Sequence, residues 1–379
     1  MSQVNLRLGS WRSWRDRLVA SPGFQRWAAD FPLTRPVAQR RARSLFDITA
    51  GFVYSQILYA CVELDLFHLL AGGPLSLDAL GPRMQMPNQV ADRLLRAAVA
   101  LRLLERRGAD PAGSPRFGLG VHGAAMLGNP GIAAMVRHHR MLYGDLADPL
   151  ALLRGEVGET ELQRYWAYAG APAPAQSGDA AVSEYSGLMT ASNALVAGDV
   201  LDAYSLKDHQ CLLDVGGGEG NFLIETARRW PHLRLELFDL PAVASRAEER
   251  FARLGLAGRI ATHGGDLMSA SLPKGADVVS LVRVIHDHDD DKAMLILRAV
   301  RAALPPGGIL MLAEPMSETP GSEPVGDAYF GLYLFAMGSG RPRSPRELRA
   351  MLREAGFGRV WLRRTRRPMQ TRLLLARSG

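Results

Sequence analysis

Residues 284–291, Val-Ile-His-Asp-His-Asp-Asp-Asp, hold the side chains of this chain best suited to acid–base chemistry. They continue a run over 276–284 that is rich in branched apolar residues and predicts a buried strand. A histidine at the end of such a strand, His286, can take a proton from a substrate hydroxyl. The apolar run 308–313 ends in Glu314, whose carboxylate can hold the imidazole in one tautomer and stabilise its protonated form. We therefore predict that His286 is a general base and that Glu314 orients it.

A glycine cluster follows an earlier apolar run and predicts a ligand-binding turn. Residues 211–220 read Cys-Leu-Leu-Asp-Val-Gly-Gly-Gly-Glu-Gly and precede an amphipathic stretch, which is the order strand, turn, helix. Gly216 and Gly218 permit positive φ and a close approach of ligand to backbone. The dinucleotide pattern G-x-G-x-x-G fails because Asn221 takes the place of the third glycine. Asp214 would repel a pyrophosphate, but it suits a ligand that carries an ammonium group and no phosphate, such as S-adenosylmethionine.

Two more acids stand at the ends of strand-like runs. The run 233–238 ends in Asp239-Leu240, where a carboxylate can bind a ribose diol. The run 259–263 leads to Asp266 and Leu267, an acid and an apolar side chain that would match the edge and face of an adenine. Each acid alone is more typical of a turn or a helix cap. Because open α/β sheets bind ligands at the carboxyl ends of their strands, the series favours one cofactor site.

These motifs together resemble those of the S-adenosylmethionine-dependent O-methyltransferases, the family of plant caffeate and flavonoid enzymes and of hydroxyindole O-methyltransferase. The segments that carry the resemblance are 214–220, 239–241, 264–266, 284–287 and 314–315, in the family's order. It implies an α/β fold, with a Rossmann-like, seven-stranded class I methyltransferase domain preceded by a mainly helical winged-helix dimerisation domain. It also implies S-adenosylmethionine as methyl donor, His286 as catalytic base and Glu314 as its partner.

Two departures from the family pattern concern the same site. The residues expected to contact the cofactor are Asp214, Gly216, Gly218, Asp239, Leu240, Asp266, Leu267, Arg283 and His288. The family usually has a tryptophan where His288 stands, so stacking on the adenine is left open. Plant members carry a second acid in a Gly-Lys-Glu-Arg segment, whereas residues 340–343 read Gly-Arg-Pro-Arg. A second acid beside the base is therefore not expected.

Residues 280–290, 302–308 and 313–316 resemble more narrowly the carotenoid O-methyltransferases of purple photosynthetic bacteria, as does the Trp- and Arg-rich amino terminus. This resemblance implies methylation of the 1-hydroxyl of acyclic carotenoids such as hydroxyneurosporene and demethylspheroidene. The chemical class of the partner is thus a small lipophilic alcohol. A phenolic, polyketide or tetrapyrrole substrate is the alternative of the same chemistry, and a regulator that binds the cofactor without catalysis is the alternative of another class.

The cluster of His286, His288 and the acids that follow could instead be a metal site, since imidazoles and carboxylates are common ligands. However, the apolar spacing from Lys292 onward is helical, which places residues 289–291 in the first turn of a helix. Acids are favoured there by the helix dipole alone. We expect no metal.

The positive charge of the chain is concentrated at its amino terminus. Residues 1–45 contain nine arginines and two aspartates, so their net charge of +7 equals that of the whole chain. The same stretch contains Trp11, Trp14 and Trp27. A basic arm with tryptophans fits a peripheral membrane contact, and a carotenoid would reside in a membrane. The alternative is an arm that packs on a partner subunit.

We expect three parts: the arm, 1–44; a helical winged-helix-like dimerisation and substrate-lid domain, 45–170; and the cofactor-binding domain, 180–379. A proline-containing loop over 171–178 would join the last two. Helices are expected over 52–70, 75–80 and 90–106, and a short wing over 116–119. A winged helix alone would suggest a DNA-binding repressor, but 88–104 has few residues free to read base edges. A homodimer that binds no nucleic acid is expected.

Global features fit an intracellular enzyme. The two cysteines are too few for a disulfide framework, which indicates a reducing compartment. No uninterrupted apolar run is long enough to span a bilayer. We expect a cytoplasmic protein that can lie on the inner, photosynthetic membrane.

Overall fold

The computed structural model describes residues 2–170 and 196–379, and the chain divides into two compact units, Met1–Leu127 and Gly128–Gly379. The predicted linker 171–178 lies outside the described residues. Each unit is described by itself below. The three-part division by role that the sequence suggests stays a prediction.

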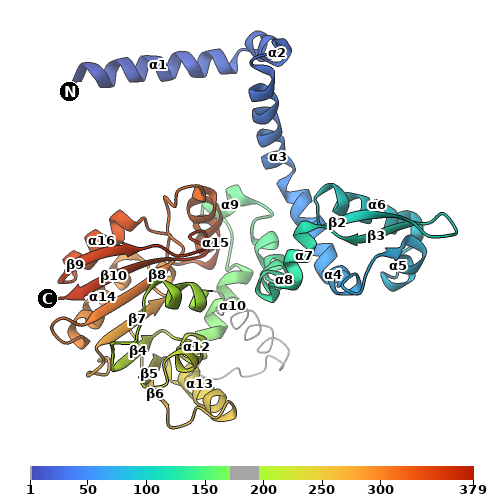
Figure 1. The fold of residues 1–379 in the computed structure, drawn as a ribbon. Coiled ribbons are helices and arrows are strands. Elements are labelled where there is room, and N and C mark those ends of the chain that lie inside the picture. Colours follow the sequence, from blue (N-terminus) through green and yellow to red (C-terminus); the bar gives the residue numbers. More distant parts are fainter. Residues whose placement is uncertain (1, 171–195) are drawn as a thin grey trace. The chain divides into compact units, whose positions relative to one another are not determined.

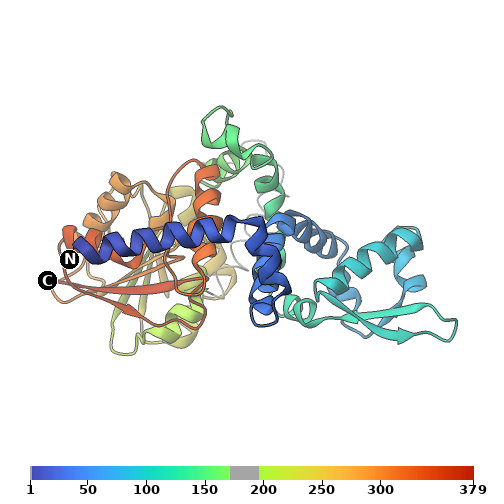
Figure 2. The same cartoon turned by 90° about the horizontal axis from the view of Figure 1, so that it is seen from above.

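The first unit combines a helical arm with a small winged-helix group (Figures 1 and 2). Its elements are α1 Ser2–Ala20, α2 Pro22–Asp30, α3 Arg35–Glu63, α4 Leu66–Leu69, β1 Leu75–Ser76, α5 Leu77–Arg83, α6 Asn88–Ala100, β2 Leu104–Ala109, β3 Pro115–Leu119 and α7 Val121–Leu127. The three strands form one antiparallel sheet in the order β1-β3-β2. Helix α6 buries Ala91, Leu95 and Ala98, the i, i+4, i+7 face of an amphipathic helix.

Two predicted helices of this unit have different ends in the structure. The helix expected over 90–106 ends at Ala100, because Arg102 takes a left-handed conformation with φ 57° and the chain continues as β2. The wing is therefore a two-stranded hairpin rather than the short segment predicted. The helix expected over 52–70 begins earlier, at Arg35, and is interrupted at Asp65, whose φ is 52°.

Helix α3 also corrects the expectation that no segment could span a bilayer. It has 29 residues and, by length and composition, is the one helix of the described residues that could cross a membrane. The expectation failed because it required an uninterrupted apolar run, whereas a helical window tolerates one or two charges. Leu45, Phe46, Ile48 and Phe52 on α3 are each more than 60% exposed in the single chain, so this helix is not a core helix of its own subunit.

The second unit is an α/β domain with a seven-stranded sheet (Figure 1). Its strands are β4 Cys211–Val215, β5 Arg234–Asp239, β6 Ile260–Gly264, β7 Val278–Val282, β8 Ile309–Glu314, β9 Phe357–Arg363 and β10 Arg372–Ser378. Their order is β6-β5-β4-β7-β8-β10-β9, parallel except for β10, which pairs antiparallel with β8 and β9. The predicted fold class and the five strands ending in acids or His286 are confirmed.

The helices of this unit cover both faces of the sheet. They are α8 Pro130–Asp145, α9 Pro149–Leu153, α10 Glu161–Gly170, α12 Asn221–Arg229, α13 Pro241–Arg253, η1 Ile285–Asp287, α14 Asp290–Ala303, the π-helix η2 Pro324–Phe330, α15 Gly331–Met337 and α16 Pro345–Glu354. Leu310 and Leu312 of β8 pack into the core beside α14 and α16, while Met311 packs into the core beside α12 and α13. Strands buried on both faces read as continuous apolar runs, which is why the sequence revealed them.

Three helices of the second unit form a further layer. Leu142 of α8, Leu162 of α10 and Leu334 of α15 share one small apolar core. The first two belong to the segment 45–170 that the sequence assigned to the helical domain, and they lie in the same compact unit as the sheet.

Candidate active site

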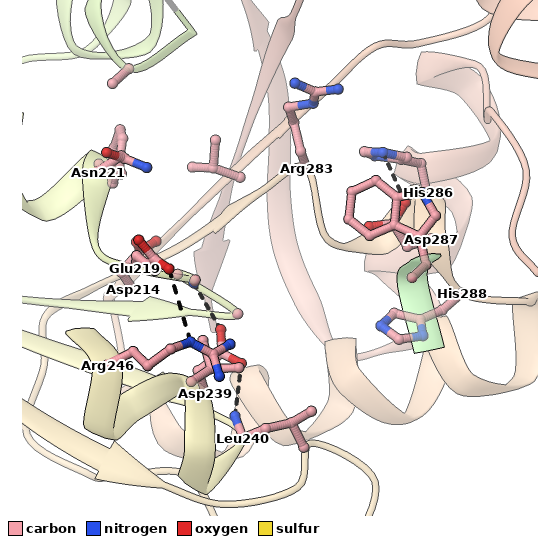
Figure 3. Close-up of a pocket in the computed structure, with 18 of the residues that line it drawn as sticks. Asp214, Glu219, Asn221, Asp239, Leu240, Arg246, Arg283, His286, Asp287 and His288 are labelled. Atoms are coloured by element: carbon pink, nitrogen blue, oxygen red, sulfur yellow. Dashed lines mark hydrogen bonds and ion pairs between the residues drawn. The ribbon is translucent and has the colours of Figure 1, made fainter. Parts of the chain in front are cut away.

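A cavity of about 350 Å³ opens at the carboxyl ends of β4, β5 and β7 in the second unit. Its lining is polar on one side and aromatic on another. The polar side includes Asp214, Gly216, Gly217, Gly218, Glu219, Asp239 and Arg246, and the apolar side includes Met135, Trp166, Tyr329, Phe330 and Tyr333. Figure 3 shows Glu219 and Asp239 facing His286, Asp287 and His288 across this cavity.

The glycine turn after β4 is held by left-handed backbone and close packing. Gly216 and Gly218 have φ of 68° and 57°, a region that side chains rarely adopt. A Cβ on Gly216 would lie 2.8 Å from Val284, and one on Gly220 would collide with the ring of Phe251. Gly220 thus allows the turn to pack closely against Phe251, one position before Asn221, where the dinucleotide pattern has its third glycine. Only the Cβ of Gly218 would point into open space.

Asp239 ties the next strand end to this turn. Its carboxylate accepts hydrogen bonds from the backbone N–H of Gly218 at 2.8 Å and of Leu240 at 2.7 Å. Burial raises the pKa of Asp239, and these two donors oppose that effect. Both Asp239 and Leu240 line the cavity, as predicted for cofactor contacts.

Asp214 is 1% exposed and has one oxygen in use. The hydroxyl of Ser280 donates to Oδ1 at 2.6 Å, while Oδ2 has no hydrogen-bond partner in the described part of the chain. Burial raises the pKa of Asp214 to about 7. A buried carboxylate oxygen without a donor at the cavity wall fits a ligand that brings a donor or a positive charge. A pyrophosphate would instead meet Asp214, Glu219 and Asp239 together.

Glu219 and Arg246 line the same side of the cavity and were not identified from the sequence. Glu219 Oε1 lies 3.9 Å from Arg246 Nε, and Glu219 Oε2 lies 3.9 Å from Arg250 Nη1. Arg250 also donates to the side chain of Asn221 at 2.8 Å. The glycine-rich motif could have indicated Glu219, but nothing in the sequence marks an arginine inside α13 as a cavity residue.

The predicted pair of His286 and Glu314 is present and buried, at 6% and 2% exposure. The Nδ1–H of His286 donates to Glu314 Oε2. The other oxygen, Oε1, accepts from the backbone N–H of Val284 at 3.2 Å and of Ile285 at 2.8 Å. One carboxylate therefore fixes both the imidazole and the turn that carries it, and it engages Nδ1 and not Nε2.

A second acid contacts His286, and this corrects the expectation that only one would. Asp287 Oδ1 lies 3.1 Å from His286 Nε2. The acid comes from the residue next to the base and not from the segment 340–343, so the comparison with plant enzymes could not find it. Burial lowers the pKa of His286, but the carboxylates of Asp287 and Glu314 outweigh burial and raise it to about 10. The two carboxylates therefore favour the protonated form of the imidazole.

The segment 340–343 supports the base in a different way. The guanidinium of Arg343, 2% exposed, donates to the carbonyls of Ile285 at 2.8 Å and His288 at 2.7 Å. A Cβ on Gly340 would collide with the carbonyl of His286. These contacts close the turn from its outer side and leave its inner side to the cavity.

Two predicted cofactor residues of this turn, Arg283 and His288, line the cavity. Arg283 has a φ of 59°, and its guanidinium lies 6.0 Å from the ring centre of Phe330. Its backbone N–H donates to Ala313 at 2.8 Å. Burial lowers the pKa of the His288 imidazole.

Asp266 and Leu267 are not brought to this cavity. Asp266 is exposed, and its carboxylate accepts from the backbone N–H of Met268 at 2.9 Å, the turn role that the sequence analysis weighed against cofactor contact. Leu267 packs against the core under the sheet. Their predicted contact with the adenine has no support in this arrangement of β6.

The sequence raised an aromatic wall at Tyr329, Phe330 and Tyr333 as the alternative to core packing, and all three line the cavity. The hydroxyl of Tyr333 bonds His138 Nε2 at 2.7 Å and accepts from Trp166 Nε1 at 3.1 Å. The hydroxyl of Tyr329 bonds His139 Nε2 at 2.7 Å. Because both hydroxyls are engaged by histidines of α8, the wall offers the cavity mainly ring surface. The participating histidines carry no motif and are identified only by the fold.

The acids after His288 have other partners than a metal. Asp289 is the residue before α14, and Asp290 and Asp291 lie in its first turn, as predicted. Asp290 accepts from Arg341 and Arg343 at 2.7–3.2 Å. Within residues 2–170 and 196–379, no group of three or more His, Cys, Asp or Glu could hold a metal ion.

Comparison with known proteins completes this description. Residues 143–358 match the O-methyltransferase domain family, and residues 46–126 match the O-methyltransferase dimerisation domain. The chain belongs to the S-adenosylmethionine-dependent O-methyltransferases. The family resemblance recognised from the motifs is thus confirmed, and the dimerisation domain supports a homodimer.

Two relatives and one solved structure show the extent of the similarity. The chain is 44% identical over 344 residues to demethylspheroidene O-methyltransferase of Cereibacter sphaeroides, covering 91% of this chain and 89% of that protein. It is 42% identical over 350 residues to the enzyme of that name in Rhodobacter capsulatus, covering 92% and 85%. The crystal structure of human N-acetylserotonin methyltransferase in complex with SAM superposes with a TM-score of 0.71 at 24% identity, covering 89% and 98%.

The residues present fit the methyl donor of this family. The glycine turn would let the ligand approach the backbone at Gly218, Asp239 would hold the ribose, and Asp214 would face the positively charged part. When bound, S-adenosylmethionine supplies a methyl group on a positively charged sulfur. Across the cavity, His286 lies on the side opposite Glu219 and Asp239.

Proposed function

We propose that this methyltransferase acts on the 1-hydroxyl of an acyclic carotenoid such as demethylspheroidene, with His286 as general base. The similarity to two demethylspheroidene O-methyltransferases, at 44% and 42% identity over most of both chains, supports the substrate class. The observation that carries the mechanism is the buried pair of His286 and Glu314 at the wall of the cavity.

His286 would act through Nε2, because Glu314 takes Nδ1. A tertiary alcohol is far less acidic than a phenol, so an imidazole cannot ionise it beforehand and accepts the proton as the C–O bond forms. When bound, the donor would supply the methyl group to the hydroxyl oxygen and keep the electron pair of its carbon–sulfur bond, and His286 would hold the released proton on Nε2. Holding the three reacting atoms in line can contribute up to about 7–11 kcal/mol in favourable cases.

The aromatic wall supports an apolar substrate. Tyr329 and Tyr333 line the cavity, and their hydroxyls are already hydrogen-bonded to His139 and His138. Because both hydroxyls are already hydrogen-bonded, they would contribute little to the recognition of a polar substrate. A polyene has only π-surface and methyl groups to offer, which match ring faces.

The test is methyl transfer by the purified chain from isotopically labelled methyl donor. Demethylspheroidene and hydroxyneurosporene in detergent would be compared with caffeate, and the labelled ether would be located by mass spectrometry. We expect the label at the 1-oxygen of the carotenoids. Label on the phenol alone would favour a phenolic substrate, and donor binding without turnover on any alcohol would favour the regulator.

The base is tested by His286→Ala, which should leave cofactor affinity nearly unchanged and lower turnover by about 10²–10⁴-fold. His232→Ala is the matched control, because His232 is exposed and is not among the residues that line the cavity. Unchanged turnover of His286→Ala would remove His286 from the mechanism.

A further inference from the structure

Helices α1 and α2 present a row of aromatic side chains to solvent. Trp11, Trp14, Trp27 and Phe31 are 59%, 49%, 51% and 40% exposed. The rings of Trp11 and Trp14 stack at 5.1 Å between centroids, and those of Trp27 and Phe31 stack at 5.2 Å. The rings of Phe24 and Trp27 lie 5.7 Å apart, so residues 24, 27 and 31 form a continuous aromatic ridge along α2 and its carboxyl end.

Arginines surround these rings. On residues 11–43 every arginine is exposed, namely Arg12, Arg15, Arg17, Arg26, Arg35, Arg40, Arg41 and Arg43. The same stretch holds two acids, Asp16 and Asp30, and Asp16 is already paired with Arg15 at 2.6 Å. We call residues 11–43, with these side chains, the aromatic–arginine arm. Its surface is strongly positive and strongly apolar at once.

The known domains leave this arm without a role. The dimerisation-domain match begins at residue 46 and the methyltransferase match at residue 143. The exposed apolar residues of α3 from Phe46 onward therefore fall within the segment that the family uses between subunits. The arm lies before that segment.

We propose that the aromatic–arginine arm docks on the surface of an anionic lipid bilayer. The tryptophan and phenylalanine rings would enter the interface, and the arginines would contact the phosphate headgroups. This inference deepens the proposed function and rests on it in one respect, because a carotenoid substrate resides in a membrane. The arm would hold the enzyme at the phase that contains its substrate.

Charge favours an anionic bilayer over a second copy of the chain as the partner of the arm. Two arms that met would each bring a net charge of +7 over residues 1–45, and like charges that face each other repel. An anionic bilayer neutralises the same charges. The aromatic residues favour an interface over a fully aqueous polyanion, since tryptophan is most stable where one side is apolar and the other is wet.

The experiment is co-sedimentation of the full-length chain with vesicles of phosphatidylcholine or of phosphatidylcholine mixed with phosphatidylglycerol. We expect binding to the mixed vesicles only, and weaker binding as salt is raised. Three of the six tryptophans of the chain lie in the arm, so a blue shift of tryptophan fluorescence should accompany binding. Absence of binding by the unaltered chain to either vesicle overturns the proposal.

Two variants separate the contributions of rings and charges. Trp11→Ser with Trp14→Ser and Trp27→Ser should reduce the partition coefficient at least about tenfold. Arg12→Gln with Arg15→Gln and Arg26→Gln should reduce it roughly a hundredfold, from about fivefold for each arginine. Both variants should remain dimers by light scattering and should keep their activity on detergent-solubilised substrate.

The control variant removes charge from another basic surface. Residues 355–379 contain seven arginines and no acid, and Arg363, Arg364 and Arg366 are exposed there without an exposed tryptophan or phenylalanine beside them. Replacing these three by Gln should leave vesicle binding unchanged. Equal loss in this control would show nonspecific attraction to any basic surface and overturn the proposal.

Three other experimental results would each support or overturn the docking proposal. Loss of the dimer with unchanged vesicle binding in the tryptophan variant identifies the arm as a subunit contact and overturns the proposal. Retention of the chain in membranes after an alkaline carbonate wash identifies α3 as a spanning helix and also overturns surface docking. Vesicle binding by a chain that methylates only phenols supports docking while refuting the proposed substrate.

Discussion

The contact between Asp287 and His286 predicts how activity depends on pH. The carboxylate lies at the nitrogen that must accept the substrate proton, 3.1 Å away, and it helps to raise the pKa of His286 to about 10. A protonated imidazole cannot act as a base, so activity should rise with pH as His286 loses its proton. Asp287→Asn keeps the size of the side chain and removes its charge. We expect this variant to lower the pKa of His286 and to move the rise in activity to lower pH.

The size of the shift follows from the geometry. Two unit charges 3.1 Å apart interact by about 5 kcal/mol at an effective dielectric constant of about 20. The side chain of Asp287 is 36% exposed, so solvent screens this interaction and the net effect is smaller. Neighbouring opposite charges usually shift a pKa by about 1–3 units, and the exposure favours the lower part of that range. We expect a fall of about 1–2 units, equivalent to about 1.4–2.7 kcal/mol.

The assay is an NMR titration of the histidine side chains in ligand-free protein, combined with the pH profile of kcat/KM. The chain has nine histidines, and His286→Gln identifies the signal that belongs to His286. The rising limb of kcat/KM reports the same group in the free enzyme. The two measurements should give a pKa that is lower in Asp287→Asn by the same amount.

Asp291→Asn is the matched control. Asp291 is exposed in the first turn of α14, and its substitution makes the same change of charge four residues after Asp287. It should leave the pKa of His286 within about 0.3 unit of the unaltered enzyme, as expected for a screened surface charge. An unchanged or higher pKa in Asp287→Asn would refute the assignment of the raised pKa to this carboxylate.

Three further outcomes follow from the structure. Glu314→Gln should keep the backbone contacts of Oε1 but lose the charge beside Nδ1, so kcat should fall about 10²–10⁴-fold while calorimetry shows unchanged cofactor affinity. Gly216→Ala and Gly255→Ala both place a side chain at a φ near 70°, which costs about 1–2 kcal/mol. Only the new Cβ at position 216 meets Val284. Thermal unfolding should therefore show that Gly216→Ala is at least about 1 kcal/mol less stable than Gly255→Ala. Burial and the neighbouring His139 lower the pKa of His138 from 6.5 to about 4. The free energy of unfolding should therefore fall by about 3 kcal/mol between roughly pH 6.5 and 4, and His138→Gln should lose that much less over the same range.

The central strands of the sheet, β4, β5, β7 and β8, could be predicted because each is marked twice. A strand covered by helices on both faces reads as an unbroken apolar run, and the end of the run carries the glycine or acid that serves the ligand. Asp214, Asp239 and Glu314 were found in this way. The end of α6 could not be found, because Leu101, Leu103 and Leu104 continue an apolar pattern while the backbone turns at Arg102. Side-chain periodicity does not report a single left-handed residue.

The site was predicted where it depends on local sequence and missed where it depends on packing. His138 and Tyr333 are 195 residues apart, and neither belongs to a motif. Asp287 was read as part of an acidic cluster, since a carboxylate next to a histidine in sequence need not face it in space. The conformation that brings the two together is imposed by Arg343 and Gly340, which close the turn from a distant part of the chain.

The charges of the cavity match both ends of the proposed reaction. The donor arrives with a positive sulfur, and the transfer leaves that sulfur neutral while His286 gains a proton. A unit of positive charge therefore moves across the cavity and is not lost from it. Asp214 and Asp239 lie on the side where the charge begins, and Asp287 and Glu314 contact the ring where it ends. The raised pKa of His286 thus has two effects: it disfavours the neutral base before the reaction, and it stabilises the imidazolium that the reaction forms. A weak acid such as a tertiary alcohol benefits from the second effect more than a phenol does, because its proton is harder to remove.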